Sequence, residues 1–133
     1  MLSNEIGWNF DNTYSNLPRS FISKISPIPV KFPELIIFNY KLAEELGLNF
    51  SSVDKKDLSK LFSGNSLPKG SKSIAQAYAG HQFGHFTMLG DGRAVMLGEH
   101  ISKKNERFDI QFKGSGKTPY SRNGDGRAAL GPM

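Results

Sequence analysis

The sequence predicts an α+β fold in which short helices are followed by an antiparallel β-hairpin and a third strand. Three observations lead to this prediction. Capped stretches with helical patterning fall within the first 84 residues. A glycine turn at 90–92 separates two apolar runs. Residues 107–113 alternate strictly between apolar and polar side chains, which is the pattern of a half-buried strand.

Three stretches in the first part of the chain are predicted as helices. In the stretch 38–48, Asn39 is a suitable N-cap and Gly47 ends the helix. The stretch 51–64 carries four apolar residues and also ends at a glycine. The stretch 73–84 is rich in good helix formers, so it is predicted as the third helix.

The second part of the chain is predicted to be β-structure. The runs 85–89 and 93–97 flank the glycine turn at 90–92, which indicates a hairpin. In the strand predicted at 107–113, the apolar residues share one face and Lys113 leaves the end of the strand on the polar face. A glycine-rich loop without regular structure is expected after it.

The length of 133 residues is that of one domain or of one piece of a larger domain. We expect a single incomplete domain over 1–133, with an irregular and helical region at 1–84 and a glycine-rich β region at 85–133. The chain has no cysteine, which excludes disulfides, thiolate metal sites and a cysteine nucleophile. Its N-terminus lacks the basic and apolar segments of a signal peptide, and no apolar run approaches the roughly 20 residues that cross a bilayer. We therefore expect a cytoplasmic protein without a membrane partner.

The formal net charge is +5, and the basic excess leans toward the end of the chain. Four basic residues follow residue 112 against a single acidic one: Lys113, Lys117, Arg122 and Arg127 against Asp125. A basic, glycine-rich segment indicates an anionic partner such as a phosphate, a nucleotide or a nucleic acid. By charge alone, a solvated surface explains the same pattern.

Two short motifs stand out in the second part of the chain. The sequence Gly-Asp-Gly-Arg-Ala occurs at 90–94 and again at 124–128 without matching surroundings, so it is not a structural repeat. The stretch KGSGKTP at 113–119 resembles the end of a P-loop, but that motif needs a glycine where this chain has Gln111. Pro119 also interrupts the helix that should follow a P-loop. The P-loop interpretation is therefore rejected.

A glycine turn between two strands, followed by a strand that ends in lysine, is the layout of the nucleotide-binding lobe of kinases. Glycine lets the backbone approach a phosphate, and lysine supplies a compact positive charge. Many unrelated hairpins share this pattern, so it indicates nucleotide binding only weakly.

Other candidate sites are weaker. His81 and His85 have the i, i+4 spacing of a metal pair on the predicted helix, but no acidic third ligand lies between them, and a surface or packing role is favoured. The aromatic residues Tyr78, Phe83 and Phe86 are expected in the core, because no regular pattern of basic residues accompanies them.

Two long stretches identify a resemblance. AYAGHQFGHFTMLGDGRAVMLGE and DIQFKGSGKTPYSRNGDGRAALGPM closely resemble the selenoprotein O family. The resemblance implies a protein-kinase-like fold and protein adenylyltransferase activity. It also implies that ATP binds in an orientation flipped relative to kinases, so that AMP moves to a Ser, Thr or Tyr hydroxyl of an acceptor protein. Transfer of UMP is also implied for the family.

Matching the motifs residue by residue implies which positions contact the nucleotide. These are the two glycines and the arginine of the first motif, the strand lysine, and two residues of the second motif: Gly90, Gly92, Arg93, Lys113, Asp125 and Gly126. The two Gly-Asp-Gly-Arg-Ala copies would then form two walls of one nucleotide site around the lysine.

Family members are several times longer than this chain. The resemblance places the glutamate that pairs with the lysine, the catalytic aspartate and the Mg²⁺ ligands beyond Met133, so no catalytic or metal-binding residue is assigned within the chain. We expect the chain alone to be inactive. There are two alternatives. The chain is a small basic module that binds nucleotide or nucleic acid without catalysis, or it is an inactive truncated remnant. Given the resemblance, a nucleic-acid partner is not expected.

Overall fold

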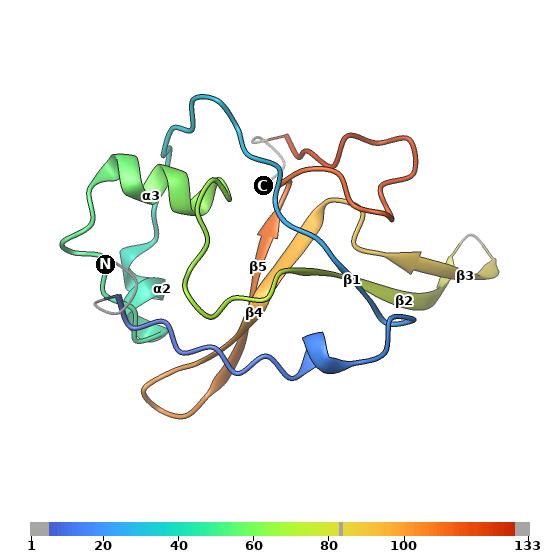
Figure 1. Ribbon diagram of the computed structural model, residues 1–133, viewed down its shortest axis with the longest axis horizontal. Helices are drawn as coiled ribbons and strands as arrows, with labels where there is room; N and C mark the ends of the chain where they lie inside the picture. The colour runs from blue at the N-terminus through green and yellow to red at the C-terminus, as the bar shows by residue number, and fades with distance from the viewer. Residues whose placement is uncertain (1–5, 83, 130–133) are drawn as a thin grey trace.

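The computed structural model describes residues 6–82 and 84–129, and it combines short helices with a five-stranded antiparallel sheet (Figure 1). The predicted α+β class is confirmed. The helical elements are η1 (Tyr14–Asn16), α2 (Tyr40–Glu45) and α3 (Lys55–Phe62). The strands are β1 (Ile22–Lys24), β2 (Ile74–Gln82), β3 (His85–Gly90), β4 (Ala94–Ile101) and β5 (Arg107–Lys113).

The first two predicted helices are confirmed, and their caps explain where they begin. Asn39 accepts a hydrogen bond from the backbone N–H of Leu42 at 3.0 Å, and so satisfies a donor that the first turn of α2 leaves open. Asp54 does the same for Asp57 at the start of α3, at 2.8 Å. After α2, Gly47 adopts a left-handed φ of +75°, which ends the helix without strain.

The third predicted helix, at 73–84, is wrong, because this stretch forms β2. Alanine favours helices when a segment is considered alone, but β2 has strand partners on both sides. Small side chains alternate along it at Ala75, Ala77 and Ala79, with larger residues between them. That two-residue period is a strand signal, and Ala75 is fully buried in the sheet.

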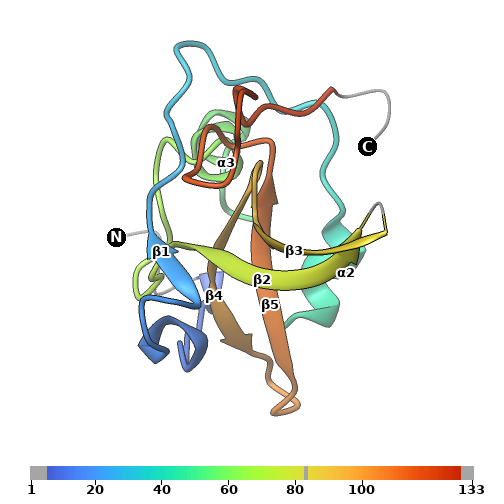
Figure 2. The ribbon, with the colours of Figure 1, turned by 90° about the vertical axis from the view of Figure 1, so that its right-hand side faces the viewer.

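The strands on either side of the glycine turn are both present, but they do not pair with each other as a hairpin. The hairpin is β2–β3, with His81 opposite Phe86, and β4 pairs with β5 and with the start of β2 (Figure 2). The strand order is β1-β2-β4-β5, with β3 added to the outer half of β2. The glycine turn therefore carries the chain from the β2–β3 arm back to the main part of the sheet.

β5 matches its prediction, and it carries Lys113 at its end. Its residues alternate between half-buried apolar and exposed polar side chains. The register with β4 shifts between Met96 and Gly98, which marks a bulge. Gly98 is required there, because a Cβ at this position would collide with Asn12 of the N-terminal segment.

The N-terminal segment packs along β4 and is fastened by a buried carboxylate. Glu99 accepts hydrogen bonds from the Thr13 hydroxyl and from the Tyr14 backbone N–H, both at 2.7 Å. Arg107 of β5 forms a salt bridge with the same carboxylate at 3.1 Å and with Asp11 at 2.6 Å. These contacts join the start of the chain to β4 and to the edge strand β5.

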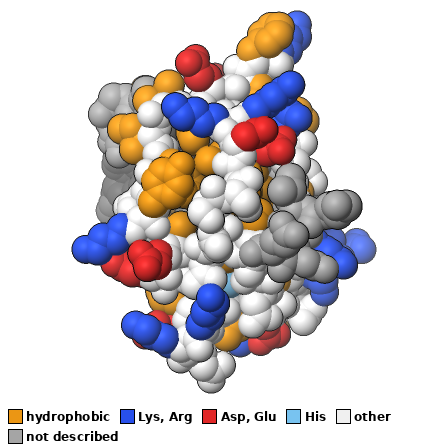
Figure 3. Space-filling model, turned by 90° about the vertical axis from the view of Figure 1, so that its left-hand side faces the viewer, with side chains coloured by type: hydrophobic (Ala, Val, Ile, Leu, Met, Phe, Trp, Pro, Cys, Tyr) orange, Lys and Arg blue, Asp and Glu red, His pale blue; other side chains and the backbone are white. Residues whose placement is uncertain are grey.

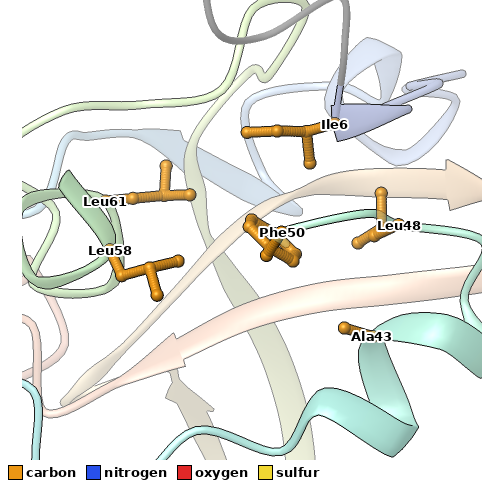
Figure 4. Packing of buried hydrophobic residues seen from close by; sticks show 6 residues of the cluster. All are labelled: Ile6, Ala43, Leu48, Phe50, Leu58 and Leu61. Atoms are coloured by element: carbon orange, nitrogen blue, oxygen red, sulfur yellow. The ribbon is translucent and has the colours of Figure 1, made fainter. Parts of the chain in front are cut away.

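The larger apolar core lies between the helices and the N-terminal segment (Figure 4). Its buried members are Ile6, Ala43, Leu48, Phe50, Leu58 and Leu61. His100 of β4 is buried beside this core. Its Nδ1 accepts a hydrogen bond from the Asn9 backbone N–H, so the ring proton is on Nε2. Nε2 therefore donates to the Leu46 carbonyl at 2.8 Å. The core thus fixes the helices against one end of β4.

Some apolar side chains remain at the surface. Figure 3 shows them among charged groups on the face that carries α2 and α3. The connection before α2 is the most exposed, with Phe32 at 92% and Ile37 at 85%. Among the helices that the structure describes, none has the length and apolar character needed to cross a membrane.

The buried carboxylate makes stability depend on pH. Burial acts to raise the pKa of Glu99, but the hydrogen bonds from Tyr14 and Thr13 and the charge of Arg107 outweigh burial and hold it below the ordinary value of 4.5. The ionised group therefore stabilises the fold above pH 4.5. That contribution is lost as the pH falls from 4.5 through the lower pKa of the folded state.

We predict that Glu99→Gln lowers the free energy of unfolding by about 1–3 kcal/mol at neutral pH, because charge-assisted hydrogen bonds are lost. The difference from wild type should shrink as the pH falls below 4.5. Urea denaturation at a series of pH values measures both effects. The exposed Glu106→Gln is the matched control, and a difference that does not change with pH would contradict the assignment.

Candidate functional site

A cavity of about 890 Å³ lies beside the glycine turn. Its walls come from β3 and the turn, from the end of β5, and from the loop 114–127, which Figures 1 and 2 show beside the β3–β4 connection. The six residues predicted to contact a nucleotide all line this cavity: Gly90, Gly92, Arg93, Lys113, Asp125 and Gly126. The structure thus brings together the two Gly-Asp-Gly-Arg-Ala copies, and the nucleotide contact itself stays a prediction.

The glycine turn is fastened to β2 by Asp91. Its backbone N–H donates to the Gln76 carbonyl at 2.9 Å, and its carboxylate accepts from the Gln76 N–H at 2.9 Å. Burial raises the pKa of Asp91, and the hydrogen bond from Gln76 acts in the opposite direction. Since Gln76 lies where β2 passes from its β1 and β4 partners to β3, Asp91 secures the point at which the strands diverge.

Two hydroxyl groups fasten the loop 114–127 to the same turn. Thr118 is buried, and its hydroxyl donates to the Asp91 carbonyl. The Ser121 hydroxyl donates to the Gly92 carbonyl and accepts from the Thr118 backbone N–H at 2.8 Å. The loop has no helix or strand, so these side-chain bonds hold its position relative to the turn.

Close backbone packing between the two segments explains several of their glycines. Neither Gly90 nor Gly92 has a positive φ, so the turn conformation alone does not require glycine there. A Cβ on Gly90 would lie 2.6 Å from two carbons of the Tyr120 ring, and a Cβ on Gly92 would lie 3.0 Å from the Tyr120 carbonyl oxygen. Gly126 has a φ of +72°, and a Cβ there would overlap the backbone of Gly116.

Lys113 reaches the cavity from the end of β5. It pairs with Ala94 of β4, and the next backbone N–H, of Gly114, donates to the Arg93 carbonyl at 2.5 Å. The exposed face predicted for Lys113 is confirmed. Within residues 6–82 and 84–129, no carboxylate lies within salt-bridge distance of Lys113.

The cavity has a positive lining. Four cationic side chains line it against two carboxylates: Arg93, Lys113, Arg122 and Arg127 against Asp91 and Asp125. In the part of the chain that the structure describes, the backbone N–H groups of Gly92 and Arg93 donate to no protein acceptor. Adjacent unpaired N–H groups beside cationic side chains are suited to bind an anion such as a phosphate.

The lining does not provide a complete metal site. Among the described residues, no three His, Cys, Asp or Glu side chains gather at one point. The cavity contributes only the carboxylates of Asp91 and Asp125, and each already accepts a hydrogen bond, from Gln76 and from the Arg127 backbone N–H respectively. A Mg²⁺ ion, which prefers several oxygen ligands, would need more than these residues supply.

Sequence reasoning missed several cavity residues. Arg122 and Arg127 contributed to the basic count of the segment, but their places in the lining were not predicted. Tyr78, Gln111 and Tyr120 also line the cavity. Gln111 had a detectable signal, because it lies on the polar face of β5 two residues before Lys113. Tyr120 had none, because its position depends on how an irregular loop folds back.

The histidine and aromatic candidates occupy different surroundings from those predicted. His81 and His85 lie near the β2–β3 connection, not on a helix. Tyr78 is 49% exposed and Phe86 is 76% exposed, so the expectation that they belong to the core is wrong. Phe83 lies outside the described residues. Among the described residues, β2 and β3 make their main contacts with other strands and not with a helix, which explains the exposure of these side chains.

Nearly the whole chain matches one protein family. Residues 5–132 match the profile of a family described as "Protein adenylyltransferase SelO".

Similar proteins carry the name "Protein nucleotidyltransferase YdiU". That of Pelagibacter ubique is 69% identical over 128 residues, which is 96% of this chain and 26% of the relative. That of Nitrosococcus oceani is 62% identical over 133 residues, or 100% of this chain and 27% of the relative. That of Brevibacillus brevis is 61% identical over 129 residues, which is 97% of this chain and 26% of the relative. The chain thus spans about a quarter of the length of these relatives.

We predict that Gly126→Ala increases the mobility of the loop 114–127. Alanine in the left-handed region costs about 1–2 kcal/mol, and the overlap with Gly116 adds to this cost. Faster amide hydrogen exchange in residues 114–127 measures the effect. Gly80→Ala is the control, because a Cβ on Gly80 meets nothing within 4 Å; equal effects of the two variants would contradict the packing argument.

Proposed function

Because the chain belongs to the SelO family of protein adenylyltransferases, we propose that it forms the N-terminal, phosphate-binding part of a protein nucleotidyltransferase. The complete protein would transfer AMP, or UMP, from a nucleoside triphosphate to Ser, Thr or Tyr hydroxyls of acceptor proteins. The residues described here would bind and orient the triphosphate. They would not activate the acceptor.

One observation supports this proposal above the others. Six residues chosen from two distant motifs and a strand end all line one positive cavity of about 890 Å³. That volume lies in the range of about 300–1,000 Å³ that is usual for small-molecule sites. A nucleoside triphosphate combines the size and the negative charge that such a lining accommodates.

The roles within the cavity follow from its chemistry. Lys113 and Arg93 would pair with phosphate oxygens, while the N–H groups of Gly92 and Arg93 would donate hydrogen bonds to them. In the transfer, an acceptor oxygen would bond to the α-phosphorus as pyrophosphate leaves, and the hydroxyl proton would go to a base. Mg²⁺ would neutralise charge on the phosphates. We place that base and the metal ligands outside the described residues.

A basic module that binds nucleic acid without catalysis is the main alternative. Its affinity would fall steeply with salt, because it would depend on counterion release along many phosphates. A single nucleotide cavity should instead prefer ATP to an oligonucleotide. Competition between the two ligands at several salt concentrations distinguishes these functions.

We predict that Lys113→Ala in the whole native protein weakens ATP binding about tenfold or more, because a charge-assisted contact is worth about 1.5–3 kcal/mol. Lys117→Ala is the matched control, since Lys117 is exposed on the same loop and does not line the cavity. Isothermal titration calorimetry measures both affinities. An unchanged affinity for Lys113→Ala would remove this lysine from the site.

We also predict that the 133-residue chain alone transfers no AMP, because we place the groups that activate the acceptor and hold the metal outside this chain. Mass spectrometry after incubation with ATP, Mg²⁺ and a mixture of proteins tests this. Any protein that gains the mass of AMP in the presence of the chain, but not with ATP alone, would refute the proposed division of roles.

A further inference from the structure

Tyr120 is the residue at which the two segments of the cavity and the sheet meet. Its ring lies against Gly90, and its carbonyl oxygen lies beside Gly92. Its hydroxyl is 3.0 Å from the hydroxyl of Ser23 on β1.

We propose that Tyr120 is a positioning residue for the cavity, and that position 90 is a glycine because the Tyr120 ring occupies the space of a side chain there. This inference rests on the proposed nucleotide binding. The inference goes beyond nucleotide binding, because it explains the glycine at position 90 by packing within the protein and not by direct contact with the ligand.

The direction of the missing Cβ supports the proposal. A side chain on Gly90 would extend toward the loop 114–127, because the three atoms nearest to that Cβ all belong to the Tyr120 ring. If ligand approach were the sole reason for a glycine at position 90, its Cβ position would instead be open space. Gly80 on the same β2–β3 hairpin has such open space, since nothing lies within 4 Å of its Cβ position.

The surrounding bonds explain how the ring controls the turn. The Tyr120 N–H donates to the Thr118 hydroxyl at 3.1 Å, and that hydroxyl donates to the Asp91 carbonyl. The Ser121 hydroxyl donates to the next carbonyl of the turn, that of Gly92. Tyr120 thus belongs to a short segment whose two hydroxyl groups bond to consecutive turn residues. Moving its ring should therefore shift the turn relative to the loop.

The link to Ser23 connects this arrangement to the sheet. Ser23 pairs with Ala75, which is fully buried in β2. The contact between the Tyr120 and Ser23 hydroxyls is half-buried. Its loss should therefore weaken ATP binding less than loss of the Tyr120 ring. Tyr120→Phe separates the two contributions, because it keeps the ring and removes only the hydroxyl.

A double-mutant cycle between positions 90 and 120 tests the proposal in the whole native protein, with ATP affinity measured by calorimetry. Gly90→Ala should weaken binding about tenfold, because the new methyl group collides with the ring. Tyr120→Ala should also weaken binding about tenfold, because the turn loses its support. In the Tyr120→Ala background, adding Gly90→Ala should cost less than about twofold, since the space is then open.

The conservative variant keeps the test informative if Tyr120→Ala folds poorly. In the Tyr120→Phe background the ring remains, so Gly90→Ala should again weaken binding about tenfold. Tyr40→Phe, on the exposed surface of α2, is the matched control and should leave the affinity unchanged. In steady-state kinetics, Tyr120→Ala should raise KM for ATP more than it lowers kcat, a division that general loss of folded protein would not produce.

Two outcomes would overturn the inference. If Gly90→Ala costs as much in the Tyr120→Ala background as in the presence of the native Tyr120, the glycine serves the ligand and not the ring. If Tyr120→Ala leaves the affinity unchanged, the ring does not position the turn. Lys113→Ala measured in the same series distinguishes failure of this inference from failure of nucleotide binding, because it should weaken ATP binding whatever the role of Tyr120.

Discussion

The packing of the loop 114–127 against the glycine turn is the interaction on which the candidate site depends. The loop has no regular element of its own, and the turn does not belong to a hairpin that would hold it in place. Two hydroxyl donors and one aromatic ring connect them. Without these contacts, Lys113 would still leave the end of β5, but the opposite wall of the cavity would have no fixed distance from it.

This constraint provides a second explanation for the glycines of the turn. Sequence reasoning explained Gly90 and Gly92 by the need of a phosphate to approach the backbone. The structure shows a different need at the same positions, since protein atoms occupy the space where the side chains would be. The two causes are compatible, because a turn held closely by a loop on one side can still present its N–H groups to a ligand on the other.

Local sequence signals predicted the elements that depend mainly on local interactions. Both true helices have a capping side chain, and β5 has an uninterrupted two-residue period, so each could be recognised alone. The stretch 73–84 was misassigned because its helix propensity competes with strand pairing to distant segments. The partner of β3 was missed for a similar reason: a glycine turn resembles a hairpin turn whether or not its two strands pair.

The site residues could be named from the resemblance but not placed by it. The family motifs identified six lining residues. The residues that hold the lining together are Thr118, Tyr120 and Ser121, which lie between the two Gly-Asp-Gly-Arg-Ala copies and carry no pattern that points to Asp91 or Gly92. Their positions depend on left-handed glycines and one left-handed arginine, Arg122, which reverse the chain after β5. Such reversals are determined by packing against distant backbone. A motif can therefore identify the residues that line a cavity, but it does not explain which contacts hold the cavity in shape.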